Sequence, residues 1–250
     1  MLKPELYDLM FKRKSIRSFD ATPLDAATLS EIAAFAESAV SLYDIKSAFK
    51  IYDASQVKGM VGKAPHFLSI YSEEKNGCLE NAGYIMEQID LFLSSRGIGS
   101  CWQGMAKPPK FTEENETLKY IVTLAFGKPS APLHRENLDE FKRKPLNEIS
   151  SCPDESELLE TVRLAPSAVN SQTWFYAGKK GEIHVYCKPN MLFKNMSFVD
   201  MGIALCFMTL AAQKEGRHID IIHQDPNLPE YIKYKYIATA KIKSKTTQLS

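Results

Sequence analysis

Four short segments recur in the same order in the two halves of this 250-residue chain, and this internal repeat constrains the fold more than any other feature. Each segment has a counterpart 116 to 129 positions later. The pairs are Ala36–Val40 with Ala165–Val169, His66–Tyr71 with Glu182–Cys187, Gly83–Gly97 with Gly202–Gly216, and Tyr120–Leu124 with Tyr236–Ala240. One pair alone could arise by chance, but four in order predict a duplicated unit of helix, strand, helix and strand.

The third pair predicts two core helices. In the first copy, Ile85, Ile89 and Phe92 are spaced three and four positions apart, which is typical of one helix face. In the second copy, Met201 through Ala212 is apolar nearly all round, and such a helix is buried on every side. We therefore expect the two equivalent helices to pack against each other at the centre, as they would across the two-fold axis of a homodimer.

The other segments define the fold class and the halves. Strand-like runs rich in Val, Ile, Thr and Tyr alternate with helices, which favours an α+β or α/β fold with a mixed sheet. The last strand of the first copy ends in turn residues at Gly127–Pro132, and the charged segment Arg135–Ile149 follows it. The predicted boundary therefore gives a first half of residues 1–149 and a shorter second half of residues 150–250.

Charge and cysteine content exclude several classes of protein. With 31 basic and 30 acidic residues the net charge is +1, so no global field attracts nucleic acid or an anionic membrane. The five cysteines and five histidines lack disulfide-framework or zinc-ligand spacing, and we expect no metal. The start, Met1–Glu5, lacks an apolar signal core, and no uninterrupted apolar run approaches membrane-spanning length. We expect a cytoplasmic protein without membrane or nucleic-acid partners.

The differences between the two copies indicate a binding site. Lys12–Ser18 contains four basic residues and two hydroxyl groups that can surround a phosphate, whereas the lead-in of the second copy, Cys152–Glu157, is acidic. Conversely, Asn170–Trp174 offers donors and acceptors for the polar edge of a heterocycle, where the first copy has Ser41–Tyr43. Each half keeps what the other lacks, so we expect one complete site where a homodimer would hold two.

The motifs that carry these differences resemble those of the FMN-dependent nitroreductases. The similar segments are Arg13–Phe19, Ala165–Trp174, Arg96–Gly104, Leu124–Pro129 and Lys142–Leu146. The resemblance covers most of residues 10 to 146 and, out of the usual order, 158 to 215. It is strongest to the subgroup in which one chain contains both subunit-like halves. It implies an α+β nitroreductase-like fold: a mixed sheet flanked by helices, folded as an internally duplicated pseudo-dimer.

The resemblance also implies which residues bind FMN. The phosphate would be held by Arg13, Lys14 and Ser15, helped by the basic residues Lys142, Arg143 and Lys144. Arg17 would lie near the pyrimidine edge and stabilise the negative charge that develops there on reduction. The remaining contacts would come from Pro166, Ser167 and Asn170 against the ring system and from backbone N–H groups near Gly104 and Met105 toward N5. No side chain is expected to act as catalyst, because the flavin carries the chemistry.

The implied function is an FMN-dependent NAD(P)H oxidoreductase that reduces small electron-poor aromatic or quinone-like acceptors by ping-pong hydride transfer. Two alternatives stay open: a non-catalytic flavin-binding protein and a flavin-free scaffold that retains the fold. Because a pseudo-dimer buries its own symmetric interface, we expect a monomer.

Several residues also have plain structural interpretations. The cluster Lys12–Arg17 could be a solvated helix end, and Trp102 and Trp174 are more typical of core packing than of stacking. Cys101 lies in the expected flavin loop, but we expect it to be inert, since nothing beside it in the sequence would lower its pKa.

Overall fold

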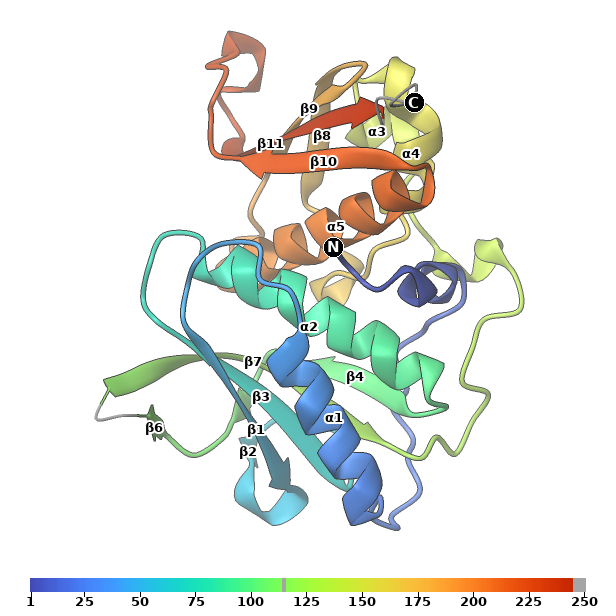
Figure 1. The fold of residues 1–250 in the computed structure, drawn as a ribbon, viewed down its shortest axis with the longest axis vertical. Coiled ribbons are helices and arrows are strands. Elements are labelled where there is room, and N and C mark those ends of the chain that lie inside the picture. The colour runs from blue at the N-terminus through green and yellow to red at the C-terminus, as the bar shows by residue number, and fades with distance from the viewer. Residues whose placement is uncertain (114–115, 245–250) are drawn as a thin grey trace, which may run out of the picture.

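Two antiparallel sheets lie on opposite sides of a central pair of helices in the computed structural model, which describes residues 1–113 and 116–244 (Figure 1). The central helices are α2 (Cys78–Ser95) and α5 (Lys194–Lys214). They come from the two copies of the repeat and pack along each other, which confirms the expected core. The class is α+β, also as expected.

The first sheet has the strand order β1-β3-β7-β4 and belongs to the first half of the chain. Its strands are β1 (Ser47–Asp53), β3 (His66–Ser72), β7 (Glu116–Gly127) and β4 (Gly99–Gln103), with β6 (Phe111–Glu113) paired to β7. A separate ribbon joins β2 (Lys58–Gly59) to β5 (Ala106–Lys107). Helix α1 (Ala26–Ser38) packs against α2 and β1, and it begins at Asp25, whose side chain accepts a hydrogen bond from Thr28 N.

The second sheet repeats this order with strands of the second half. Its strands are β8 (Trp174–Lys179), β9 (Glu182–Cys187), β11 (Lys235–Ser244) and β10 (Arg217–Ile222), paired as β8-β9-β11-β10. The pairing of β7 with β3 skips Ile121, and that of β11 with β9 skips Ile237, which lies 116 positions later. Both sheets therefore carry a β-bulge at equivalent positions, so the repeat extends to an irregular detail.

The shorter helices connect these elements. They are α3 (Leu146–Ile149), α4 (Ser156–Val162) and the 3-10 helices η1 (Pro4–Phe11), η2 (Ala54–Gln56), η3 (Leu138–Phe141), η4 (Pro153–Glu155), η5 (Ala168–Asn170) and η6 (Pro229–Tyr231). Helix α3, the last element of the expected first half, packs against α4 and β8 of the second half. The named strands pair antiparallel, and an isolated parallel bridge joins Ser150 to Tyr176 of β8.

The two central helices approach each other at a pair of equivalent glycines. A Cβ atom on Gly83 would lie 2.0 Å from the carbonyl oxygen of Val199, and one on Gly202 would lie 1.8 Å from that of Glu80. Gly83 and Glu80 are related to Gly202 and Val199 by the same repeat interval, so the contact is reciprocal, as in a two-fold dimer interface. Only glycine allows backbones this close.

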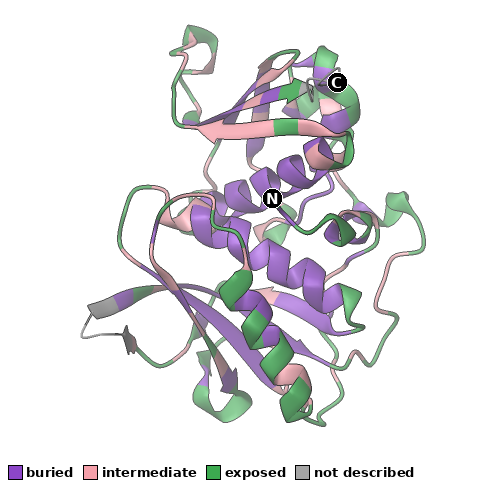
Figure 2. Ribbon diagram, in the orientation of Figure 1, coloured by how far each residue is buried: buried purple, intermediate pink, exposed green. Residues whose placement is uncertain are grey.

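Burial follows the central pair. Figure 2 shows α2 and α5 as almost continuously buried ribbons between the two sheets. Helix α5 is long and apolar enough to cross a membrane, but 89% of its apolar window is buried inside the structure. A core helix of a folded domain has this property, because its whole circumference packs against protein.

Candidate functional site

A cavity of about 410 Å³ lies where the two halves meet, within the size range of small-molecule sites. Six of the predicted flavin-binding residues line it: Ser15, Arg17, Gly104, Met105, Pro166 and Ser167. The first four come from the segment before α1 and the turn after β4, and the last two from the loop after α4. The cavity therefore combines the basic segment of the first half with the loop after α4 of the second half, and neither half has both of these segments.

The rest of the cavity wall is largely apolar. It includes three methionines (Met60, Met105 and Met196), as well as Phe193 and Trp102. Met60 is 74% exposed, so part of the wall is open to solvent. Flexible, polarisable methionine side chains adapt to flat ligands of different shape. Of the two tryptophans, Trp102 borders the cavity, whereas Trp174 is buried in β8.

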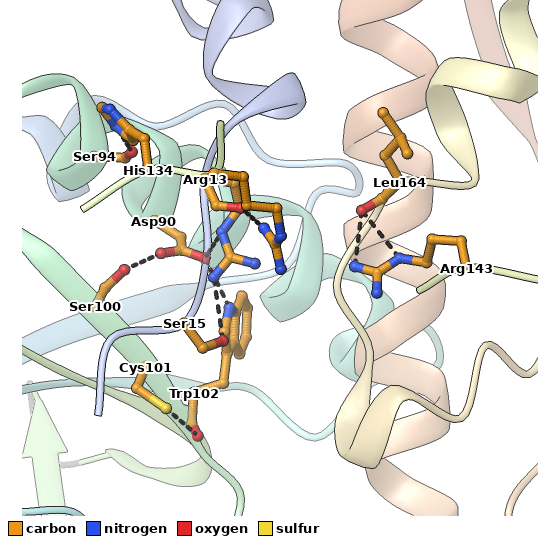
Figure 3. A network of polar contacts seen from close by, with 11 residues as sticks. Arg13, Ser15, Asp90, Ser94, Ser100, Cys101, Trp102, His134, Arg143 and Leu164 are labelled. Carbon is orange, nitrogen blue, oxygen red and sulfur yellow. Dashed lines mark hydrogen bonds and ion pairs between the residues drawn. The ribbon is translucent and has the colours of Figure 1, made fainter. Parts of the chain in front are cut away.

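Arg13 is buried and is not among the residues that line the cavity; Figure 3 shows its side chain between Asp90 and Ser15. Its Nε lies 3.2 Å from Asp90 Oδ2 of α2, and its Nη2 lies 3.4 Å from Ser15 Oγ, to which it donates. Asp90 also accepts hydrogen bonds from Ser100 Oγ and, at 3.0 Å, from Trp102 Nε1. Arg13 and Asp90 thus fix Ser15 and Trp102 at the cavity wall.

Two further arginines extend this cationic group. Arg135 donates from Nη1 to the carbonyl oxygen of Arg13, and its guanidinium lies 4.0 Å from the centroid of the Phe141 ring. Arg143 lies 5.5 Å from the same centroid. Burial, reinforced by the neighbouring guanidinium groups, lowers the pKa of both Arg135 and Arg143 to about 10. The three arginines therefore repel one another, and an anion bound near them would relieve that repulsion.

The basic run is attached to the loop of the second half. Arg143 donates to the carbonyl oxygen of Leu164 and, at 2.6 Å, to Asn170 Oδ1, while Asn170 Nδ2 donates to Lys142 O. Lys144 Nζ donates to the carbonyl oxygen of Ser171. Among the predicted residues, Asn170, Lys142 and Lys144 thus join the halves instead of lining the cavity.

Lys14 also lies outside the cavity wall. It is half-buried, and its positive charge acts on two neighbours, His134 and Glu140. Burial, reinforced by Lys12 and Lys14, lowers the pKa of His134, whose Nε2 lies 3.0 Å from Ser94 Oγ. Lys14 therefore contributes charge near the cationic group rather than a contact at the cavity.

Cys101 lines the cavity, but its chemistry is passive. Burial raises the pKa of its thiol, an effect that the nearby Arg17 only partly offsets. The thiol is therefore protonated at neutral pH, and a protonated thiol is a poor nucleophile.

Two acidic residues at the site carry no motif in the sequence. Glu87 of α2 is fully buried, neither of its carboxyl oxygens has a hydrogen-bond partner among the described residues, and burial raises its pKa well above the ordinary value. Asp200 of α5 lines the cavity and accepts from the backbone N–H of Ala168. In the sequence, Asp200 could have been noticed as an acidic residue within the apolar segment that forms α5, because buried carboxyl groups are rare.

The fold is that of a nitroreductase-like protein. A crystal structure of a "putative nitroreductase" from Thermotoga maritima superimposes with a TM-score of 0.64 at 22% identity, covering 96% of this chain and 94% of that one. A family model described as "Putative TM nitroreductase" matches residues 5–212. The chain belongs to this nitroreductase family.

Other solved structures match only part of the chain. A nitroreductase family protein from Clostridium difficile 630 has 17% identity, covers 59% of this chain and 96% of its own, and gives a TM-score of 0.46. An FMN-dependent nitroreductase from Clostridium difficile R20291 has 16% identity, covers 53% and 95%, and gives 0.41. No curated protein matches the sequence.

Proposed function

We propose that this chain is an FMN-dependent NAD(P)H oxidoreductase that reduces small electron-poor aromatic or quinone-like acceptors by ping-pong hydride transfer. The observation that carries the proposal is the cavity at the junction, which joins Ser15 and Arg17 of one half to Pro166 and Ser167 of the other. Membership of the nitroreductase family supports the same reaction class.

The residues present fit an FMN molecule in two respects. Arg13, Arg135 and Arg143 do not line the cavity, but Arg13 contacts Ser15 of its wall, and the positive charge of this cluster favours a phosphate dianion bound near Ser15. The apolar wall suits a flat aromatic ring system. At Gly104, a Cβ atom would lie 3.3 Å from Met196 Sδ, so the absence of a side chain lets Met196 pack closely against the turn at the cavity wall.

Each group of residues would have a distinct role. Bound FMN would supply hydride acceptance from a reduced nicotinamide and electron delivery to a second substrate. Ser15, backed by Arg13, would hold the phosphate, and Arg17 would stabilise negative charge at the pyrimidine edge. Phe193 and Met196 would shield the reacting face from water, whereas Met60 lies on the side that is open to solvent.

The same proposal includes the organisation of the chain. Residues 1–149 and 150–250 act as two subunit-like halves of a pseudo-dimer with a single flavin site. The reciprocal helix contact at Gly83 and Gly202 supports this arrangement. Because the symmetric interface is internal, the protein is a monomer, and it works in the cytoplasm.

The visible absorption spectrum of the purified protein tests the proposal, before and after FMN is added and the excess removed. We expect one flavin per chain and steady consumption of NADH or NADPH with a quinone or nitroaromatic acceptor. Two flavins per chain would contradict the single-site arrangement. Flavin retention without turnover would favour a non-catalytic flavin-binding protein, and a colourless protein that ignores FMN would favour a scaffold.

A further inference from the structure

Asp200 is an acidic residue in a place where a carboxylate is unfavourable. It lies in the apolar part of α5, is 3% exposed, and borders the cavity. Its two carboxyl oxygens lie 3.0 and 3.1 Å from a single donor, the backbone N–H of Ala168. A buried carboxylate usually needs a cation or several donors, and among the described residues Asp200 has this one N–H and no paired cation.

The resulting state of Asp200 at neutral pH is the neutral acid. Burial raises the pKa of its carboxyl group to about 8, although the Ala168 N–H acts in the opposite direction. Within the described part of the chain, no hydrogen bond uses the proton of this acid. That proton is therefore available to a molecule in the cavity.

The other half of the molecule provides an internal control. The position equivalent to Asp200 in the repeat is Asn81 of α2, two residues before Gly83 as Asp200 is two before Gly202. Asn81 Oδ1 accepts from Leu42 N at 2.8 Å and from Tyr43 N at 3.0 Å, so it holds the loop after α1 as Asp200 holds the loop after α4. An amide is sufficient for that role. The half that contributes its loop to the cavity has an acid instead.

We propose that Asp200 is a catalytic residue that donates a proton to the acceptor as the acceptor is reduced. This inference rests on the proposed oxidoreductase function and adds a side-chain acid to a site in which the flavin alone was expected to carry the chemistry. It also explains why the loop-holding position differs between Asn81 and Asp200.

The step balances as follows. The acceptor takes up a hydride, which is one proton with two electrons, and a reduced nicotinamide would be the source of those electrons. The O–H bond of Asp200 breaks, and its proton bonds to the acceptor atom that carries the new electron pair. The acceptor leaves reduced by two electrons and two protons. The Asp200 carboxylate then takes a proton from solvent.

Among the buried and half-buried carboxyl groups in this part of the molecule, Asp200 is the one that lines the cavity, whereas Glu80 and Glu87 do not. The titratable and charged groups on elements packed against this part of α5 or across the cavity include Cys187 of β9, Lys235 of β11, Glu80 and Glu87 of α2, Cys101 and Arg17. Burial raises the pKa of Cys187 to about 12 and also raises that of Cys101, so both thiols are neutral. Burial likewise raises the pKa values of Glu80 and Glu87. Arg17 is exposed and cationic.

Two substitutions separate proton donation from loop positioning. Asp200→Asn reproduces the arrangement of Asn81 and retains an acceptor for Ala168 N–H, whereas Asp200→Ala removes both the acceptor and the proton. With the FMN-loaded protein reduced beforehand, we expect the acceptor half-reaction to slow by roughly 10² to 10⁴-fold in both variants. The wild-type rate should fall as pH rises through about 8, and that dependence should be absent in Asp200→Asn. The nicotinamide half-reaction should change little in Asp200→Asn.

A measurement on the flavin-free protein gives a readout apart from activity. Carboxyl ¹³C chemical shifts of protein labelled at aspartate should include one group titrating near pH 8, absent in Asp200→Asn. An Asp200 signal that titrates near 4, or an Asp200→Asn acceptor half-reaction with wild-type rate and pH profile, would overturn the inference alone. If the acceptor half-reaction kept its wild-type rate in Asp200→Asn and slowed only in Asp200→Ala, Asp200 would be a loop-positioning residue and not a proton donor. A wild-type protein without FMN or without nicotinamide consumption would overturn the proposed function and this inference with it.

Discussion

The two halves of the molecule use buried and half-buried arginines in opposite ways. In the second half, Arg217 binds Glu155 with both terminal nitrogens, at 2.6 and 2.5 Å, and Glu155 also accepts from Gly181 N. Arg217 has a further acidic neighbour in Glu215. In the first half, Arg13 has Asp90 as its ion-pair partner, while burial, reinforced by neighbouring guanidinium groups, lowers the pKa of both Arg135 and Arg143.

This difference distinguishes a structural ion pair from a binding site. The charges of Arg217 and its carboxylates compensate each other within the fold, so no ligand is needed there. The arginines of the first half hold more positive charge than their surroundings neutralise, which costs stability until an anion binds. The same type of residue therefore has two roles, and its neighbours decide which one.

The largest effect on stability should come from adding a methyl group where the backbones of the two central helices touch. Gly202→Ala places a methyl group 1.8 Å from Glu80 O, and Gly83→Ala places one 2.0 Å from Val199 O. Overlap with backbone cannot be relieved by a rotamer change, so each should cost more than about 3 kcal/mol of unfolding free energy in urea titrations. Gly97→Ala is the control, since it meets no atom within 4 Å and carries only the strain of φ +75°. If Gly202→Ala and Gly83→Ala lowered the unfolding free energy no more than Gly97→Ala does, the close contact between the helix backbones would be contradicted.

The second effect is on pH dependence and compares Asp200 with an amide like Asn81. Because the folded pKa of Asp200 is raised to about 8, its contribution to stability is fully present below pH 4 and is lost as pH rises through about 8. Relative to Asp200→Asn, the wild-type unfolding free energy should fall by roughly 5 kcal/mol between pH 4 and 9. Parallel curves for the two proteins would mean that Asp200 is ionised in the fold.

The third effect tests the comparison of the arginines directly. Arg217→Met should lower the unfolding free energy by about 2 to 3 kcal/mol, because Glu155 keeps a buried charge without its partner, and FMN affinity should not change. Arg135→Met should do the reverse, with FMN binding weakened about tenfold and flavin-free stability unchanged or raised. Fluorescence titration with FMN and thermal unfolding measure the two quantities. Equal behaviour of the two variants would remove the distinction between the halves.

The smallest effect should come from a single neutral contact at the phosphate end. Ser15→Ala removes one hydroxyl that lines the cavity and accepts from Arg13, so FMN affinity should fall about threefold to tenfold. Ser18→Ala is the matched control, because Ser18 belongs to the same segment but does not line the cavity. A larger loss for Ser18→Ala would move the phosphate position along the segment.

Much of the architecture could be predicted from the sequence, because the repeated segments carry strong periodic patterns. The central helices and their glycine-ended termini are examples: Gly97 and Gly216 both have positive φ, as a helix-ending glycine does. The resemblance also placed Ser15, Arg17 and Pro166 in segments that do form one cavity.

The remaining features depend on contacts between distant segments. Arg135 precedes the predicted basic run, and no motif marks it, yet the fold places it against Arg13 and Phe141. Lys144 follows the expected pattern in sequence, but its ammonium group is used by the loop carbonyl of Ser171. Sequence periodicity identifies which face of a helix is buried, but not which single buried residue borders a cavity.

The equivalent positions Asn81 and Asp200 also show what covalent joining makes available to evolution. In an assembly of two identical chains, one codon specifies the residue on both sides of the axis, and every substitution is tested twice in the same molecule. Here the two positions have separate codons. One could acquire an acid while the other kept an amide, so a chemically asymmetric site could arise without disturbing the symmetric framework that supports it.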